Sequence, residues 1–388
     1  MRWKFPDPDN AAEEKRKAAT LQKIVAWWKA FESRSADIKA LFRRQQNWDL
    51  ADWMHQHFSA IDPRLMWEYG PGLTGGDRLV MTPESVRQLR PLVDVILQNA
   101  PALPGWEFYA YRLPEGEEMA RETVKVRTGG DISRMRFKAE RGNLNRIDIV
   151  FCSPDHAARN EKQVFNDCFV TCESMLGEEV LDKWIGSIEA DKNAVMSKDF
   201  LPVGELLATV KALISQIVGS LPSKPCLLTT ETATWSLYKL KPKTAEDYPE
   251  QLDMYVGRTM YPDMWMCTHN NQPFDSCRFS RHGEIFAHLK LDGSEGLDTE
   301  KFSDKAEIEE ALDEVLVPEG LGAVIGGGTG NRYSYIDLAL VDVKNGIEAI
   351  KARLREGNVP KRSWILFFDS DLRDEWIGIW NDTPPPPA

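Results

Sequence analysis

The order of the predicted strands and helices constrains the fold of this chain more than any single motif. Residues 284–369 combine short apolar or alternating runs, which indicate strands, with longer segments that have apolar residues every three or four positions, which indicate helices. The resulting order is strand, helix, strand, strand, helix, strand, and residues 105–190 give the same order. This is the order of a ferredoxin-like module. We therefore predict an α+β fold with two ferredoxin-like modules.

The two predicted modules share a short phrase, which suggests an internal duplication. GNLNRIDI begins at Gly142 and GNRYSYIDL begins at Gly330. Both phrases lie between the second and third predicted strands of their module. The repeated order of elements supports the same inference.

A helical segment is expected before the first module, and a polar stretch marks the boundary between the modules. Apolar residues recur on one helical face near the N-terminus, at Leu21, Ile24, Trp28 and Phe31. The polar stretch is KPKTAEDYPEQ, residues 241–251. We therefore predict an N-terminal helical segment at 1–60, a first α+β module with a following helix and strand pair at 61–240, and a second α+β module at 252–388.

The charge of the chain argues against nucleic-acid binding. It carries 60 acidic and 48 basic residues, which give a net charge of −12, and its pI is near 5.2. Proteins hold phosphate backbones with clustered Lys and Arg, so the overall field of this chain would repel them. Hydrophobic residues make up 42% of the chain, which is enough to build a sizeable core.

Neither the N-terminus nor the longest apolar stretch predicts a membrane segment. Residues 1–20 contain no apolar core of a signal peptide. Leu206–Val218 is interrupted by Lys211 and is too short to span a bilayer. The six cysteines lack the spacing of a disulfide framework and are expected to be reduced core thiols. The sequence therefore predicts a cytoplasmic protein without a membrane partner.

The glycine-rich stretch GAVIGGGTGNR, residues 322–332, is the clearest candidate for a phosphate-binding loop, but it matches neither phosphate motif. Counted from Gly326, the third glycine of G-x-G-x-x-G falls on Asn331, and Gly328 and Thr329 occupy the Lys and Ser/Thr positions of a P-loop. Both motifs must open a helix, whereas these glycines run into RYSYIDLALV, which alternates like a strand. We therefore predict a flexible strand-to-strand connection. The candidate ligand-binding residues beside it are Thr329, Asn331, Arg332 and Asp337.

Two cysteines and two histidines lie close together in the chain, at Cys267, His269, Cys277 and His282. On a strand, Cys267 and His269 would face the same side, as two ligands of one metal do. The spacing is not one of the usual zinc spacings, and it contains no C-x-x-C pair. We therefore expect buried cysteines, surface histidines and no metal, with these four residues as the alternative set of metal ligands.

Three predicted strands interleave aromatic and charged residues, MWEYGP at 66–71, GWEFYAYR at 105–112 and EWIGIW at 375–380. Alternation places the aromatic side chains of each strand on one face of a sheet. If helices cover that face, the aromatic residues are core; if it is open, they line a cleft for a ligand or partner. The candidate residues of such a cleft are Trp67, Glu68, Trp106 and Glu107. Carboxylates on strands, including Asp337, are expected to be solvated.

Residues 65–112, LMWEYGPG…LVMTPE…LRPLVDVILQNAPALPGWEFYAYR, resemble a block that recurs in a family of bacterial proteins with a domain of unknown function. The block consists of two strands, a helix and a strand of the form AP-x-x-x-GWEF. The element order also resembles that of small bacterial ferredoxin-like regulators, such as those that bind ribonucleases. The resemblance implies a bacterial, cytosolic protein and transfers no catalytic residue.

The sequence contains no catalytic motif such as G-x-S-x-G or H-E-x-x-H. We therefore predict a non-enzymatic binding or regulatory protein, for example an immunity-like one, that binds another protein or a small ligand and needs no cofactor. The alternative is a hydrolase or another small-molecule enzyme with its site between the two modules. The residues that would form this site are Arg332, Asn331 and Asp337 with Glu68 or Glu107.

Overall fold

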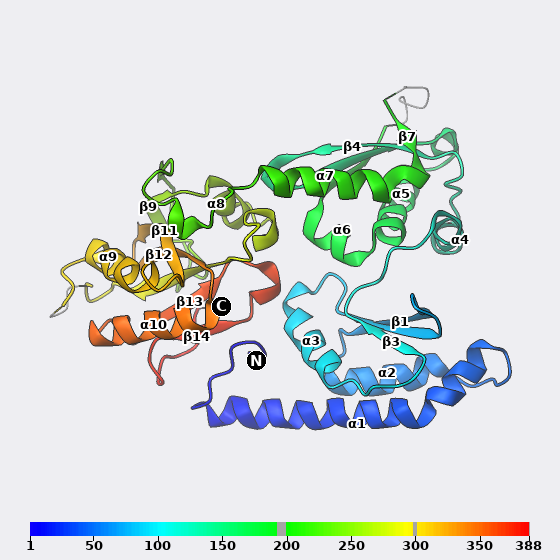
Figure 1. Ribbon diagram of the computed structural model, residues 1–388, viewed down its shortest axis with the longest axis horizontal. Coiled ribbons are helices and arrows are strands. Elements are labelled where there is room, and N and C mark those ends of the chain that lie inside the picture. Colours follow the sequence, from blue (N-terminus) through cyan, green and yellow to red (C-terminus); the bar gives the residue numbers. More distant parts are fainter. Residues whose placement is uncertain (192–198, 298–300, 388) are drawn as a thin grey trace. The chain divides into compact units, whose positions relative to one another are not determined.

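The computed structural model describes residues 1–191, 199–297 and 301–387, and the chain divides into two compact units. The first unit comprises Met1–Arg16 and Leu221–Ala388, and the second unit comprises Lys17–Ser220. The chain therefore crosses between the units twice, once within α1 (Ala11–Phe42) and once directly after α7 (Leu206–Ser220) (Figure 1).

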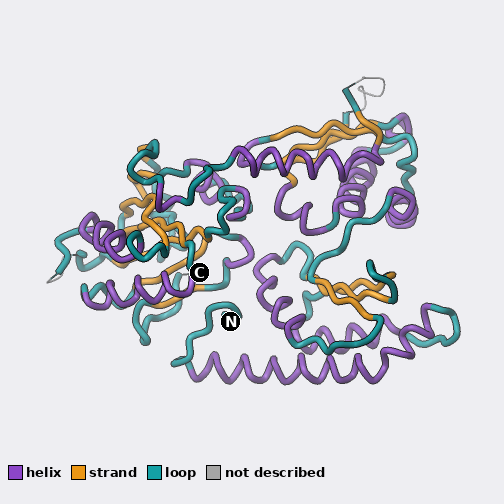
Figure 2. The backbone as a smooth tube through the Cα atoms, viewed as in Figure 1, coloured by secondary structure: helices purple, strands orange, loops and turns teal. Residues whose placement is uncertain are grey.

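Over the described residues, the first unit is built on one seven-stranded antiparallel sheet with the strand order β14-β13-β10-β12-β11-β9-β8 (Figure 2). The strands are β8 (Ser236–Lys239), β9 (Met254–Thr259), β10 (Ile285–Asp292), β11 (Gly322–Gly330), β12 (Tyr333–Leu340), β13 (Ser363–Phe367) and β14 (Trp376–Gly378). The helices are α8 (Pro262–His269), α9 (Lys305–Leu316) and α10 (Val343–Glu356).

The middle of this sheet follows the order predicted from the sequence, β10-α9-β11-β12-α10-β13. Asp304 and Asp342 precede α9 and α10, and their carboxylates accept backbone N–H groups of the first turn, which fixes where each helix begins. The two helices cover one face of the sheet with an apolar core that includes Leu289, Leu291, Ile308, Leu312, Ile336, Leu338, Ile350 and Leu354. Burial of this core is the main source of stability of the first unit.

The N-terminal residues belong to the first unit because a buried carboxylate binds their backbone. Glu375, which is 2% exposed, accepts hydrogen bonds from the backbone N–H groups of Trp3 (2.6 Å), Lys4 (3.1 Å) and Phe5 (2.9 Å). The ring of Phe5 also stacks on that of Phe367, with 4.7 Å between the centroids. These contacts hold the beginning of the chain beside β13 and β14.

The second unit contains two separate sheets within its described part, a three-stranded sheet β1-β2-β3 and a four-stranded sheet β6-β5-β4-β7. The strands are β1 (Met66–Pro71), β2 (Asp77–Thr82), β3 (Trp106–Tyr109), β4 (Arg136–Arg141), β5 (Ile147–Cys152), β6 (Ile185–Ala190) and β7 (Leu201–Pro202). The helices, besides α1 and α7, are α2 (Leu50–Ile61), α3 (Arg90–Gln98), α4 (Glu117–Thr128), α5 (Glu161–Leu176) and α6 (Glu178–Trp184).

The long helix α1 packs on the aromatic residues of β3. The ring centroids of Trp28 and Phe108 lie 4.8 Å apart, and those of Phe31 and Trp106 lie 4.7 Å apart. The indole N–H of Trp28 also donates to the carbonyl oxygen of Ile96 at 2.7 Å. The aromatic residues of this strand therefore lie in a core covered by a helix, one of the two arrangements considered from the sequence.

The structure confirms an α+β fold with an N-terminal helix, but it does not confirm a pair of ferredoxin-like modules. β3, which was expected to begin the module at 105–190, pairs in parallel with β2, whereas β4, β5 and β6 belong to the other sheet. In the first unit, β8, β9 and β14 extend the predicted four strands to seven. The two halves of the chain therefore have different sheets, and the predicted duplication gains no support.

The unit boundaries also differ from the predicted segments 1–60, 61–240 and 252–388. α1 and α2 are not a separate segment, because the apolar face of α1 is buried within the second unit. The polar stretch 241–251 is not a linker: Lys243 N donates to the carbonyl oxygen of Leu252 at 2.8 Å, and the stretch lies inside the first unit. Its polar residues cover a polar face of the sheet, which composition alone did not reveal.

One helix in the described part of the chain, Val203–Ser220, is long and apolar enough to cross a membrane by length and composition. In the structure it runs along β4 (Figure 1), and 22% of its residues are buried. Leu206, Val210 and Ile217 form the buried face. The expected absence of a membrane partner stays a prediction.

Candidate functional site

The candidate site lies on the face of the seven-stranded sheet opposite the apolar core, which we call the polar sheet face. On β10 its residues are His288, Lys290 and Asp292, and on β12 the residues directly opposite these are Asp337, Tyr335 and Tyr333. All six residues are at most 6% exposed. Buried polar groups need hydrogen-bond partners, so the segments that cover this face must supply them.

Lys290 holds the covering segment in place. Its ammonium group donates to the backbone carbonyl oxygens of Tyr248 and, at 3.0 Å, of Glu250. Tyr248 and Glu250 have φ angles of 44° and 53°, the left-handed region that non-glycine residues rarely adopt. Burial lowers the pKa of Lys290 to about 8, although Asp253 beside it raises that pKa. A buried cation therefore helps to hold the unusual backbone conformation at Tyr248 and Glu250.

Asp253 fixes the turn between β11 and β12. Its carboxylate accepts the backbone N–H groups of Arg332 and Tyr333, each at 2.8 Å, and the hydroxyl group of Tyr335 at 2.5 Å. Gly330 is required beside it, because a Cβ atom there would lie 2.3 Å from a carboxylate oxygen of Asp253. The end of the glycine-rich stretch is thus a firmly bound hairpin.

The glycine-rich stretch is strand β11 and not the flexible connection that the sequence predicts. A Cβ atom on Gly326 would lie 2.7 Å from a carboxylate oxygen of Asp337. On the neighbouring strand β9, a Cβ atom on Gly257 would lie 2.5 Å from the indole ring of Trp265. The glycines therefore leave room for two side chains, Asp337 and Trp265, above the middle of the sheet. This close approach explains their presence without a phosphate.

Asp337 is buried, contrary to the expectation that it is solvated. It is 0% exposed. Its carboxylate accepts hydrogen bonds from the indole N–H of Trp265 at 2.7 Å and from the amide of Gln251 at 3.4 Å. Burial is the main effect on its pKa and raises it to about 7, although both donors lower it. Asp337 therefore changes charge near neutral pH.

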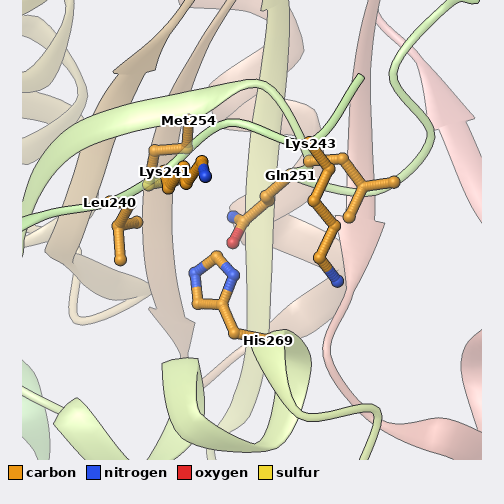
Figure 3. Close-up of a pocket in the computed structure, with 7 residues that line it drawn as sticks. Leu240, Lys241, Lys243, Gln251, Met254 and His269 are labelled. Atoms are coloured by element: carbon orange, nitrogen blue, oxygen red, sulfur yellow. The ribbon is translucent and has the colours of Figure 1, made fainter. Parts of the chain in front are cut away.

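A pocket of about 180 Å³ opens beside Gln251, which donates a hydrogen bond to Asp337. It is lined by Leu240, Lys241, Lys243, Gln251, Leu252, Met254 and His269. Gln251 is 1% exposed, and its amide and the ring of His269 point toward one another across the pocket (Figure 3). Among the described residues, neither the Gln251 Oε1 atom nor the His269 Nε2 atom has a hydrogen-bond partner. Two side chains that each carry a buried polar atom without a partner therefore line an empty space that is large enough for a small molecule.

The residues predicted beside the glycine stretch do not line this pocket. Thr329 lies on β11 opposite Ser334. Asn331 and Arg332 form the turn, and the Arg332 guanidinium pairs with Asp247 and Asp292, each at 2.9 Å. Asp337 does not line it either, but its carboxylate accepts a hydrogen bond from Gln251, which does.

The other predicted candidates, Trp67, Glu68, Trp106 and Glu107, lie in the second unit. Glu68 pairs with Arg78 at 3.1 Å. Glu107 binds the turn between β1 and β2, because its carboxylate accepts hydrogen bonds from the backbone N–H groups of Leu73 and Thr74, each at 2.8 Å. It also accepts one from the hydroxyl group of Thr74, which is the main cause that lowers the pKa of Glu107 to about 2. Both carboxylates are thus engaged in local structure.

The alternative metal ligands are not brought together. Cys267 and His269 lie on helix α8, where residues two apart point in different directions, and not on a strand as the metal alternative required. Within the described ranges, no group of three or more His, Cys, Asp or Glu side chains could hold a metal ion. All six cysteines are free, and five of them, including Cys267, are buried.

Several residues of the site escaped the sequence analysis, namely Gln251, Asp253, Trp265, His288 and Lys290. The available signal was the alternation in HLKLD, residues 288–292, which places three polar side chains on one face of a strand whose other face is apolar. The covering residues Gln251 and Asp253 gave no signal, because a polar segment looks the same whether it faces solvent or a buried polar surface.

Replacing Asp337 by asparagine is expected to change how the stability of the first unit depends on pH. The folded-state pKa of Asp337, about 7, is raised above its usual value of 3.8, so its contribution is complete below pH 4 and is lost as the pH rises through 7. From pH 5 to pH 7 this loss is about 2 kcal/mol of unfolding free energy. Urea unfolding followed through the NMR signals of β12 should show a loss of unfolding free energy from pH 5 to pH 7 that is about 2 kcal/mol larger in the native protein than in Asp337→Asn.

Asp369 provides the matched control, because burial raises its pKa to about 7 as well. It accepts the backbone N–H of Ser276 at 2.7 Å, outside the pocket. Its own pH dependence should persist in the Asp337→Asn variant. An unchanged slope in Asp337→Asn would show that Asp337 does not titrate in this range.

Comparison with known proteins gives no further guide to this site. No family model, curated protein or solved structure matches the chain. The function is therefore inferred from the geometry of the site.

Proposed function

We propose that this chain is a binding protein, and that the pocket of its first unit holds a small organic anion. The observation that carries the proposal is the Gln251 Oε1 atom, which belongs to a residue that is 1% exposed and which faces the pocket without a donor from any described residue. A buried acceptor without a hydrogen-bond donor lowers the free energy of unfolding by about 1–3 kcal/mol. A ligand that supplies the donor removes this cost.

The size of the pocket supports a ligand larger than a single water molecule. One water needs roughly 10–15 Å³ of such space, whereas the pocket offers about 180 Å³. Leu240, Leu252 and Met254 form apolar walls, and Gln251 and His269 supply polar groups from opposite sides. Mostly apolar walls with a few directed polar groups are typical of small-molecule sites.

The charge at the rim supports an anion. Lys241 and Lys243 line the pocket and are exposed. Neither forms an ion pair with another residue in the described part of the chain. His269 is kept neutral near pH 7, because burial lowers its pKa and Lys243 lowers it further. A carboxylate beside the two lysines would be favoured by their charge.

The lining residues support binding in preference to catalysis. They include no serine, cysteine or carboxylate, and the lysine, histidine and glutamine side chains that they do include offer charge and hydrogen bonds to a ligand. A regulatory role fits this chemistry, because a ligand in the pocket would contact Gln251 and so affect the hydrogen bond between Gln251 and Asp337. The fold itself hosts many functions and gives no preference.

We also propose that the centre of the sheet is a single ferredoxin-like module. Its strand order β13-β10-β12-β11 is antiparallel throughout, and its elements follow the order strand, helix, strand, strand, helix, strand. The cytoplasmic location and the resemblance to the bacterial family remain proposals beside it.

Removal of the rim charges is expected to weaken binding. In Lys241→Gln/Lys243→Gln, the affinity for propionate and butyrate should fall roughly three- to thirtyfold, because each exposed charge contributes up to about 1 kcal/mol. NMR titration of the His269 ring and the Gln251 amide measures the affinity in both proteins.

The matched control is Lys224→Gln/Lys344→Gln, which removes the same charge from exposed lysines that do not line the pocket. Its affinity should equal that of the native protein. If neither propionate nor butyrate shifts the His269 and Gln251 signals of the native protein, the pocket does not bind small carboxylates and the proposed function is wrong.

A further inference from the structure

The Gln251 amide lies between the pocket on one side and Asp337 on the other. Its Nε2 atom donates to Asp337 at 3.4 Å, and its Oε1 atom faces the pocket. A half-turn of the amide exchanges these roles, since one end of the group donates and the other accepts. The orientation of Gln251 therefore decides which kind of group a ligand must present.

The same half-turn depends on the proton of Asp337. With Nε2 toward it, Asp337 receives two donors, from Gln251 and from Trp265, and two donors favour the ionised carboxylate. With Oε1 toward it, the carboxyl must carry a proton in order to donate to that oxygen. A ligand that holds the amide with Nε2 toward Asp337 therefore favours the charged form of this carboxyl.

The groups around Asp337 leave its charged and its protonated form close in free energy. Lys305 on α9 favours the charged form and Glu309 on the same helix disfavours it. Glu309 is itself paired with Arg258 of β9 at 3.0 Å. His288, directly across on β10, is neutral, because burial lowers its pKa to about 3. Burial of Asp337 opposes its two donors and brings its pKa to about 7.

We propose that the pocket takes a small carboxylate that also carries a hydroxyl group, and that its binding releases a proton from Asp337. This rests on the proposed function. The ligand hydroxyl donates to Gln251 Oε1, and the carboxylate lies beside Lys241 and Lys243. The amide is then held with Nε2 toward Asp337. The carboxyl proton leaves to the solvent, no bond of the ligand breaks, and the extra negative charge is stabilised by Trp265 and Gln251.

Hydroxy acids and their matched acids without the hydroxyl group test this proposal on the full chain. The pairs are 3-hydroxypropionate with propionate and 4-hydroxybutyrate with butyrate, measured by calorimetry at pH 6.5 in two buffers of different ionisation enthalpy. The hydroxy acid should bind roughly three- to tenfold more tightly, the range of one net hydrogen bond. It should release up to about a quarter of a proton, because a pKa of about 7 with Nε2 toward Asp337 leaves about a quarter of this carboxyl ionised at pH 6.5.

Two variants separate the parts of the proposal. Gln251→Met removes the amide but keeps the length of the side chain, and should abolish the preference for the hydroxyl group. Asp337→Asn should abolish the release of a proton. Lys344→Gln, on the outer helix α10, should change neither.

The outcomes distinguish this proposal from the proposed function. Equal affinity for both members of each pair would overturn the role of the hydroxyl group, while binding of small carboxylates would still stand. A preference for the hydroxy acid without proton release would overturn the coupling to Asp337. If no member of either pair binds, the proposed function fails and this inference fails with it.

Discussion

Gly257→Ala is expected to lower the free energy of unfolding of the first unit by about 3 kcal/mol, the upper end of the usual cost of overpacking. The new Cβ atom would lie 2.5 Å from the ring of Trp265 and 2.7 Å from the carbonyl oxygen of Gly327. The ring must move, and its hydrogen bond to the buried carboxyl of Asp337 (2.7 Å) is then weakened or lost. The effect comes from lack of space, because Gly257 does not have a positive φ angle.

Hydrogen exchange of the amides in β9, β11 and β12 measures this free energy for the first unit separately from the second. Gly346→Ala is the control in the same unit. Its Cβ atom would lie 3.3 Å from the flexible end of Leu340, and alanine is the better helix former. Gly346→Ala should therefore be neutral or stabilising.

The size of the Trp265 ring gives a further check. Trp265→Phe removes the ring atom that the new Cβ atom would touch, so Gly257→Ala should cost less in that background than in the native one. Equal costs in both backgrounds, or a cost of Gly257→Ala below about 0.5 kcal/mol, would show that the glycines are not needed to hold Trp265 above the sheet.

The parts of the first unit that were predictable have a local cause. The helix expected at 303–316 is observed at Lys305–Leu316, because Asp304 caps it and Ile308 and Leu312 repeat at the spacing of one helical face. The strand expected at 363–369 is observed at Ser363–Phe367. In each case the residues that decide the element lie inside it or directly beside it.

The glycine-rich strand was not predictable in this way. A residue without a side chain contributes no periodicity, so GGGTG at 326–330 reads as a turn, although a strand is expected directly before it at 321–325. The reason for the glycines lies elsewhere in the chain, in Trp265 and Asp337, whose side chains need the space. The comparison with phosphate motifs used a local requirement, a helix directly after the glycines, and the structure has strand β12 in that place.

The predicted strand pairing of β3 in the second unit was wrong for a related reason. β3 was expected to pair with the strands that follow it, but it pairs with β2, which precedes it, after the crossover helix α3. The order of elements along the chain leaves both pairings possible. The choice depends on α1, whose Trp28 and Phe31 cover Phe108 and Trp106 of β3. Such contacts between distant segments do not show in the pattern of any one segment.

Glu178→Ala is the second large effect, and we expect it to destabilise the second unit by about 3 kcal/mol. Glu178 is 3% exposed. Its carboxylate accepts hydrogen bonds from Arg90 at 2.7 Å, from the backbone N–H of Arg112 at 3.0 Å and from the hydroxyl group of Thr82. Arg90 is 4% exposed, and removal of Glu178 leaves its guanidinium group with one of these two carboxylate partners, Asp182. A buried charge that loses its partner costs several times more than an exposed one.

The neighbouring residue supplies the control. Glu179 is exposed and pairs with Lys183 one helical turn away at 2.8 Å, so Glu179→Ala should cost less than about 0.5 kcal/mol. Hydrogen exchange measured across the whole second unit compares the two variants.

The elements in which Glu178→Ala increases hydrogen exchange show whether the two sheets of the second unit unfold together. Glu178 belongs to α6, whereas its partners Thr82 and Arg90 belong to β2 and α3, beside the other sheet. Because one carboxylate joins both parts, Glu178→Ala should increase exchange in β2 and α3 as much as in α6. That result would mean that the two separate sheets unfold as one cooperative body. An increase confined to α6 would mean that they are independently stable, and that the hydrogen bonds of Glu178 position α6 without uniting the unit.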